Sequence, residues 1–487
     1  MKTLTQHITK IIYVFLLLFA VLVGCSPQEP IRIRVTPTPD AEAPSAIPTT
    51  VASNPTAVDP TVIEPTLTQT VPTVMSSPTD TTVPPSRTPI QTDGSFGPII
   101  ESDYQLPSTS TPAPTIPAQP TATMSLATPI TFGDLPVLDR DQLGIQLYYN
   151  VNNDQWFQLL RRTDPLNVGW IKVQANWNFL QPDNRDQFNT AFSIFEAHVQ
   201  RAHNEGYQVL VSIAKAPDWA RGGVTEEDGP PANLDDLAYF INFMFDRFGE
   251  QISAVEVWNE PNLAREWRGG DDWSGASYMR MFRVAYDTIR ARNPNMPIIT
   301  AGLAPTRASN TIDDRLFLQQ MYDAGLNDPY YQNIAVGIHP YGWGNAPDAR
   351  CCDLSETFGW DDDPRFFFLD TIEDYREIMV ANGHENVQMW STEFGWATWE
   401  GLQSEPPDQW MSYNTSEEQA EFTMRAFEIG MERDYLGPMF LWNLNFANED
   451  LITERNEMVG YSIFVPGLPI RPVYDALRLS ERLPADS

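Results

Sequence analysis

Cysteine, histidine and basic side chains are scarce in this chain, and each shortage excludes a class of function. Only 3 cysteines and 5 histidines occur among 487 residues, and no second Cys or His pair sits at the spacing of a zinc site. Lys and Arg number 31 against 64 Asp and Glu, which gives a formal net charge of −33. So acidic a chain disfavours binding to a phosphate backbone. We therefore predict neither a metal site nor a nucleic-acid partner.

The N-terminal apolar run, residues 11–23, is too short for a comfortable membrane span. Lys2 and Lys10 precede it, and a charged start before a short apolar run is typical of an export signal. The run leads into the letters LVGC, which end at Cys25 and resemble the bacterial lipobox, in which the cysteine is lipidated. An ordinary cleaved signal and an uncleaved anchor are the alternatives. We predict an exported lipoprotein on the outer face of a bacterial membrane, with residues 1–25 as its signal peptide.

Residues 26–133 are dominated by Pro, Thr, Ser and Ala, as in TPTP and TVPPSRTP. Such a segment cannot bury enough apolar surface to offset the entropy of ordering, so we predict a disordered linker. From residue 134 the chain is rich in Trp, Phe, Tyr and Asp. Residues 134–487 are therefore the predicted folded and catalytic domain.

From residue 144 onward, β-like runs alternate with amphipathic stretches. The predicted strands are 144–149, 170–176, 208–214, 254–258, 297–302, 334–339, 387–391 and 439–443, and predicted helices include 188–205, 234–248, 275–292 and 417–433. Asn233 and Ser416 are predicted N-caps. Eight such alternations predict an α/β fold of the (β/α)8 or TIM-barrel class. No G-x-G-x-x-G or P-loop pattern follows the first strand, which disfavours nucleotide binding.

Two glutamates stand where predicted strands hand over to loops: Glu260 in VEVWNEPN and Glu393 in MWSTEFGW. A parallel barrel brings such strand ends together at one face. Two facing carboxylates in a Trp-lined groove are what hydrolysis of a glycosidic bond requires. The strand ends as a set are polar and aromatic: Lys172, Asn176, Trp177, Lys215, Trp219, Trp258, Asn259, His339, Tyr341, Trp396, Trp442 and Asn445.

The motifs WNEPN and TEFGW resemble the acid/base and nucleophile signatures of clan A glycoside hydrolases. The letters HPY at 339–341 and Trp442 match two further positions of that clan. The resemblance covers about residues 140–485 and is greatest to family 39 and family 5 enzymes, of cellulase or xylosidase type, which these short motifs do not separate.

The resemblance implies a mechanism that retains anomeric configuration, with the two carboxyls about 5–5.5 Å apart. Glu393 would form a glycosyl-enzyme ester, while Glu260 would protonate the leaving oxygen and then deprotonate water. In the clan, the residue matching Asn259 binds the sugar 2-hydroxyl. Such a mechanism requires no cofactor.

The resemblance further implies that His339 and Tyr341 orient the strand 7 carboxylate and that Trp442 forms the floor on which the sugar stacks. We also predict substrate contacts for Lys172, Trp177 and Trp396. One departure stands out, because family 5 enzymes typically carry Arg where this chain has Lys172, and Lys cannot make the bidentate fork of Arg.

The leading hypothesis is a retaining β-glycoside hydrolase whose substrate is an extracellular oligo- or polysaccharide. A non-catalytic glycan-binding lipoprotein and a transglycosidase are the alternatives. The loop from residue 342 to about 365 is long, and we expect it to shape the cleft wall, with the acidic run 361–363 as a solvated face. For the adjacent Cys351 and Cys352 in this loop, a strained disulfide and two free thiols both stay open.

Overall fold

The computed structural model describes residues 132–269, 272–352 and 360–484. The predicted signal peptide with Cys25, and the predicted linker up to residue 131, lie outside the described residues. Within the described ranges, no helix is long and apolar enough to cross a membrane.

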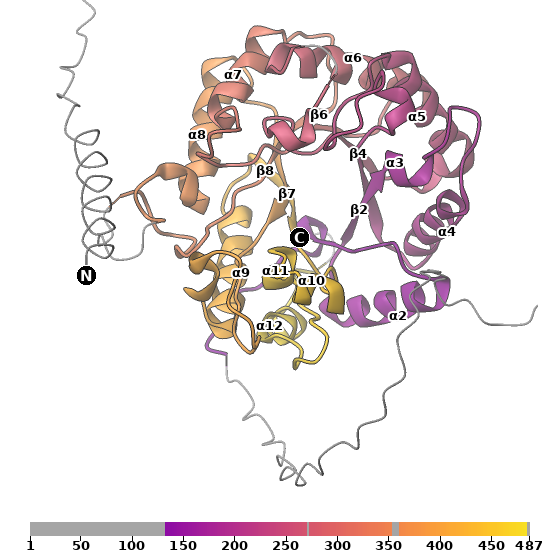
Figure 1. Ribbon diagram of the computed structural model, residues 1–487. Helices are drawn as coiled ribbons and strands as arrows, with labels where there is room; N and C mark the ends of the chain where they lie inside the picture. The colour runs from indigo at the N-terminus through magenta and orange to yellow at the C-terminus, as the bar shows by residue number, and fades with distance from the viewer. Residues whose placement is uncertain (1–131, 270–271, 353–359, 485–487) are drawn as a thin grey trace, which may run out of the picture. The chain divides into compact units, whose positions relative to one another are not determined.

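The described residues hold eight parallel strands that close into a barrel in sequence order, with helices on the outside (Figure 1). The strands are β1 (Leu143–Gln146), β2 (Trp170–Asn176), β3 (Gln208–Ala214), β4 (Ala254–Val257), β5 (Ile298–Thr300), β6 (Ile334–Ile338), β7 (Met389–Phe394) and β8 (Leu436–Leu441). Closure comes from parallel pairing of β8 with β1. The predicted (β/α)8 fold is confirmed.

The helices follow the strands in the expected alternation. They are α2 (Asn153–Thr163), α3 (Trp177–Leu180), α4 (Thr190–Asn204), α5 (Leu234–Phe248), α6 (Gly275–Arg292), α7 (Asp314–Asp323), α8 (Phe368–Ala381), α9 (Ser416–Met431), α10 (Glu449–Thr453), α11 (Met458–Tyr461) and α12 (Pro472–Leu479). The cap predicted at Asn233 is confirmed. The cap predicted at Ser416 is wrong by one residue, because Thr415 and Glu418 form a reciprocal capping box that starts α9 earlier.

Alternate residues of each strand face opposite sides of the barrel wall. On β3, Val209 and Val211 belong to the large core shared with the surrounding helices. Leu210 lies between them and joins a smaller cluster that includes Ile299 of β5 and Phe440 of β8. Strands so far apart around the ring meet only in its interior, so this cluster fills the barrel.

A polar layer in the barrel interior links the strands that carry the two glutamates. Lys172 of β2 is fully buried and lies 3.0 Å from the Glu256 carboxylate of β4. Its Nζ also donates to the carbonyl oxygen of Thr392 on β7, at 3.1 Å. A buried charge is tolerated only when paired and hydrogen-bonded, so this layer ties β2, β4 and β7 together immediately beside Glu393.

Candidate active site

Glu393 lies on β7 in a tightly defined environment. Only 6% of it is exposed. Lys172 Nζ lies 3.0 Å from its Oε1, and the Tyr341 hydroxyl donates to its Oε2 at 3.0 Å. One charged and one neutral donor therefore hold the two oxygens of this carboxylate in a fixed orientation.

Lys172 shares its charge between two carboxylates. Burial alone would lower its pKa, but the charges of Glu256 and Glu393 outweigh that effect and raise the pKa above its ordinary value. The lysine is therefore a cation at the base of the site.

Glu260 follows β4 in a loop with unusual backbone geometry. Its φ is 42°, and φ of Trp258 is 79°, so two non-glycine residues adopt the left-handed region. Such conformations persist only where the surroundings impose them. Here the Glu260 amide donates to the Gly302 carbonyl at 3.0 Å, and the Trp258 indole donates to the Glu266 carbonyl at 3.1 Å.

His339, fully buried after β6, bridges the two glutamate-bearing strands. Its Nδ1 lies 3.1 Å from Glu260 Oε1, and its Nε2 lies 3.1 Å from Thr392 Oγ1. A glycine at position 302 makes room for the ring, since a Cβ there would lie 2.2 Å from its atoms. The imidazole thus reaches Glu260 only because residue 302 lacks a side chain.

Burial alone would lower the pKa of His339, but the charge of Glu393 and the neighbouring Glu256 and Glu260 raise it to about 9. The imidazolium at neutral pH donates from both ring nitrogens. Its Nδ1–H then points to Glu260 and its Nε2–H to Thr392.

The two glutamates converge. An oxygen of Glu260, a ring nitrogen of His339 and an oxygen of Glu393 all lie within 4.8 Å of one another. These three residues are also the one group in the described part of the chain with atoms placed for a metal ion. A cation there would meet the charge of Lys172, 3.0 Å from Glu393, so the donor set fits carboxylate chemistry better than metal binding.

The electrostatics of Glu260 differ from those of an isolated buried carboxyl. Burial alone would raise its pKa, but the hydrogen bond and charge of His339, followed by Arg265, lower it below its ordinary value. Arg265 Nη2 lies 3.6 Å from Glu260 Oε2. In the free protein Glu260 is therefore a weakly basic carboxylate beside two cations.

Residues 142–425 match the family model of cellulase, glycosyl hydrolase family 5. The match covers more than half of the chain. The chain belongs to glycosyl hydrolase family 5. The predicted resemblance to clan A is confirmed, and this family 5 protein is a glycoside hydrolase by membership.

Solved structures are similar to the chain at low sequence identity. A family 39 glycoside hydrolase from Bacteroides cellulosilyticus is 18% identical with a TM-score of 0.51, over 71% of this chain and 64% of that structure. A β-xylosidase from Caulobacter crescentus is 17% identical, with a TM-score of 0.49, over 71% and 69%. The family 5 chain thus spans about two thirds of the length of both. No curated protein matches the chain.

Two other predicted sugar contacts lie near the glutamate pair of the family 5 site. Asn259 precedes Glu260 and is 8% exposed, and its Oδ1 has no hydrogen-bond partner among the described residues. Trp442 follows β8 and is half-buried, with its ring 6.0 Å from that of Tyr341. Tyr341 in turn donates to Glu393, so the Trp442 ring adjoins the glutamate pair through Tyr341.

Three predicted substrate contacts are buried instead. Trp177 has no exposed surface and stacks on Phe240, with its indole donating to Gln181. Trp396 is 1% exposed and donates to the Asn345 carbonyl at 2.7 Å. Lys172 also has no exposed surface, so it contacts Glu393 from inside the barrel and does not contact a sugar. The prediction that these three residues contact the sugar is therefore wrong. Trp177 and Trp396 pack in the core, and Lys172 supports Glu393.

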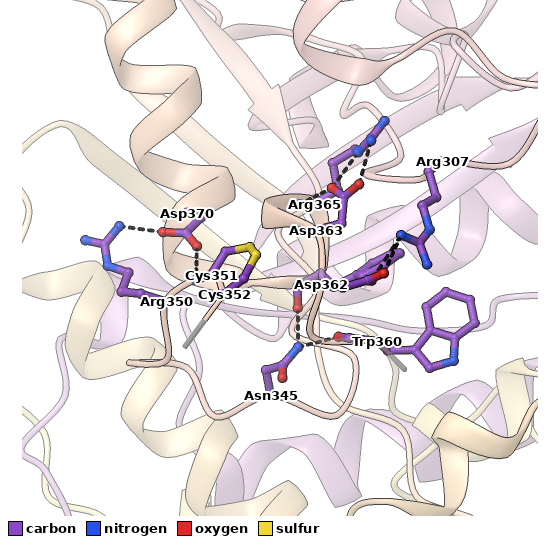
Figure 2. Close-up of a disulfide and its surroundings, with 11 residues drawn as sticks. Arg307, Asn345, Arg350, Cys351, Cys352, Trp360, Asp362, Asp363, Arg365 and Asp370 are labelled. Atoms are coloured by element: carbon purple, nitrogen blue, oxygen red, sulfur yellow. Dashed lines mark hydrogen bonds and ion pairs between the residues drawn. A yellow bond between two sulfur atoms is a disulfide. The ribbon is translucent and has the colours of Figure 1, made fainter. Parts of the chain in front are cut away.

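Tryptophans of the loops after β6 and β7 pack against one another. Trp343 and Trp360 stack with ring centroids 4.9 Å apart, and Trp410 packs against Trp343 edge-on at 4.7 Å. These rings belong to a cluster of the family 5 barrel that also contains Tyr341. Asn345 fixes the loop by donating to the carbonyl oxygens of Trp360 and Phe366 (Figure 2).

Cys351 and Cys352 of the same loop are joined by a disulfide (Figure 2). The acidic run is not the predicted solvated face, because Asp361 and Asp363 are 7% and 9% exposed. Asp363 pairs with Arg365, at 2.6 Å, which compensates its buried charge. Asp363 also caps the short 3-10 turn Pro364–Phe366 that precedes α8, and Figure 2 shows its side chain facing Arg365.

The motifs assign no role to four charged or polar residues of the site, of which only Thr392 lies inside a motif, as the first letter of TEFGW. Glu256 and Thr392 lie inside the barrel and bind Lys172, and Arg265 and Glu266 lie beside Glu260. A signal for Glu256 is present in the sequence, because a lone acid within the apolar strand AVEV requires a buried cationic partner. No comparable signal marks Arg265 or Glu266, and Thr392 has none beyond its place in TEFGW.

Proposed function

We propose that this protein is a retaining β-glycoside hydrolase that cleaves O-glycosidic bonds by double displacement. Glu393 attacks the anomeric carbon and forms a glycosyl ester, while Glu260 gives its proton to the departing oxygen. Glu260 then takes a proton from water, which attacks the ester and releases the sugar. The anomeric centre is inverted twice and so keeps its configuration.

One observation carries this proposal: oxygens of Glu260 and Glu393 lie within 4.8 Å of each other. Retaining enzymes place their carboxyls about 5–5.5 Å apart, whereas inverting enzymes leave about 6.5–9.5 Å for a water. The short approach of these oxygens supports direct attack by Glu393 over activation of a water between the two carboxyls.

The neighbours of the pair support distinct roles. Lys172 and Tyr341 hold Glu393 in place as a nucleophile, with 3.0 Å contacts to its two oxygens. Glu260 is the more exposed of the two, with 13% of its side chain accessible against 8% for Glu393. Asn259 Oδ1 is buried and accepts no hydrogen bond among the described residues, and the resemblance assigns this side chain to the sugar 2-hydroxyl.

The stereochemistry of the first product tests the proposal. An aryl β-glycoside that the enzyme accepts should release the β-anomer first, and proton NMR within the first minutes should detect that anomer before mutarotation. Initial release of the α-anomer would mean a single displacement and would exclude Glu393 as a covalent nucleophile. A panel of aryl β-glucosides and β-xylosides run alongside identifies the accepted sugar.

We further propose that the enzyme acts outside the cell as a lipoprotein anchored through Cys25. The charged start, the short apolar run and the letters LVGC support export and lipidation. The Pro- and Thr-rich segment that follows is suited to hold a barrel away from a lipid surface. In bacterial expression, labelled palmitate should enter the wild-type protein and not Cys25→Ala; equal labelling of the two would contradict this.

A further inference from the structure

Arg265 lies between two carboxylates. Its Nη2 is 3.6 Å from Glu260 Oε2, and its Nε is 3.8 Å from Glu266 Oε1. Both separations exceed a direct hydrogen bond, and 57% of the arginine side chain is exposed. The guanidinium therefore has room to move toward either carboxylate.

Glu266 is the buried member of this arrangement. It is 7% exposed, and its Oε2 has no hydrogen-bond partner among the described residues. Burial raises its pKa to about 7, against the opposing charge of Lys215, and the charges of Glu260 and Asp228 act in the same direction as burial. Glu266 is therefore neutral in acid and becomes an anion as the solution passes neutrality.

The backbone that carries the two residues is fixed. Both belong to a short 3-10 turn, Ala264–Glu266, in the loop after β4. The Trp258 indole donates to the Glu266 carbonyl, and the Asp228 amide of the preceding loop donates to the Arg265 carbonyl at 3.0 Å. The side chain of Arg265 can therefore move between Glu260 and Glu266 while the backbone stays in place.

We propose that Arg265 and Glu266 are positioning residues that together set how firmly Glu260, the proposed acid/base, holds its proton. The proposal rests on the proposed function of Glu260. When Glu266 is neutral, the charge of Arg265 acts mainly on Glu260 and favours the ionised form of Glu260. When Glu266 is ionised, it draws the guanidinium away and adds a negative charge of its own, so Glu260 keeps its proton more firmly.

Three other charged groups around the two carboxylates stay ionised across neutrality, and a fourth, Glu457, requires its own control. Lys215 is paired with Asp228 at 2.7 Å, and burial alone would lower its pKa, but Glu266 and Asp228 raise it. On the Glu260 side, His339 and Lys172 stay cationic because their pKa values are raised. Glu457 faces Arg265 from the segment before α11, and burial raises its pKa while Arg265 opposes the rise, so the shoulder should persist in Glu457→Gln if Glu266 is its source.

The pH profile of kcat/KM for an aryl β-glycoside tests the proposal. Because the pKa of Glu260 is lowered, the wild-type profile should already fall on the acid side of neutrality as Glu260 loses its proton. Near pH 7, ionisation of Glu266 should slow that fall and produce a shoulder. In Glu266→Gln the shoulder should vanish, which leaves kcat/KM unchanged in acid and about threefold or more lower above the shoulder.

Two further variants define the route. Arg265→Met should move the alkaline limb to higher pH by about half a unit or more, because Glu260 loses a neighbouring cation. Adding Glu266→Gln to Arg265→Met should then change the profile less than it does in the wild type. The matched control is Glu227→Gln, because Glu227 pairs with Arg268 on the same loops at 2.8 Å. The pH profile of this control variant should keep the shoulder.

A wild-type profile without a shoulder, or a shoulder that survives in Glu266→Gln, overturns the proposal. If circular dichroism shows that Glu266→Gln does not fold, Arg265→Met becomes the deciding variant. An alkaline limb of its pH profile that stays at the wild-type position overturns the proposal. These outcomes differ from failure of the proposed function, which would appear as full activity in Glu260→Ala or Glu393→Ala.

Discussion

Glu393→Ala should lower kcat/KM for an accepted aryl β-glycoside by about four orders of magnitude or more, because the covalent step has no other nucleophile. The carboxylate is held by Lys172 and Tyr341 at 3.0 Å each, and no second acid lies within reach of both donors among the described residues. Initial rates of aryl release measure the loss. The effect should fall on kcat rather than on KM, since Glu393 acts on the reacting carbon.

Glu385→Ala is the matched control, because Glu385 is an exposed carboxylate in the turn before β7. It should retain wild-type rates. Residual activity in Glu393→Ala within tenfold of wild type, with the circular dichroism spectrum unchanged, would contradict the role assigned to Glu393.

Lys172→Met should have the largest effect on stability. The lysine has no exposed surface and is the counter-ion of Glu256, also without exposed surface, at 3.0 Å. Removing one partner of a buried ion pair leaves an uncompensated charge and costs about 3–5 kcal/mol. Urea titration followed by tryptophan fluorescence should show the midpoint fall with the slope unchanged.

Glu256→Gln provides the control for Lys172→Met. Combined with Lys172→Met, it removes the stranded charge and should restore about half of the lost unfolding free energy or more. Activity should stay low in the double variant, because Glu393 still lacks its cationic neighbour. A loss below about 1 kcal/mol in the single variant would contradict the view that this pair is a structural ion pair.

The barrel could be predicted because its elements carry strong periodic patterns. The bounds of β2, β3, α5 and α6 agree with the prediction, since each has a regular alternation or stripe and clear ends. β8 starts three residues before the prediction, at Leu436. Gly437 and the proline after it are typical of a turn, yet β7 pairs with this segment, and a residue without a side chain leaves space for Trp390.

The site was only partly predictable. The motifs predict the positions of Glu260 and Glu393, because a residue at the C-terminal end of a barrel strand lies at the face where active sites are found. The direction of a neighbouring aromatic side chain is not fixed in the same way, so the sequence places Trp177 and Trp396 in the groove although they fill the core. Arg265 and Glu266 lie in a turn of the loop after β4, where the sequence contains no periodic pattern.

The configuration of azide products tests the two-glutamate mechanism most directly. With azide present, Glu393→Ala should form the α-glycosyl azide, because azide attacks once from the side that the carboxylate vacated. Glu260→Ala should form the β-glycosyl azide, because azide there opens an ester already made by Glu393. The opposite configurations, or a β-azide from Glu393→Ala, would contradict the assignment of Glu393 as nucleophile and Glu260 as acid/base.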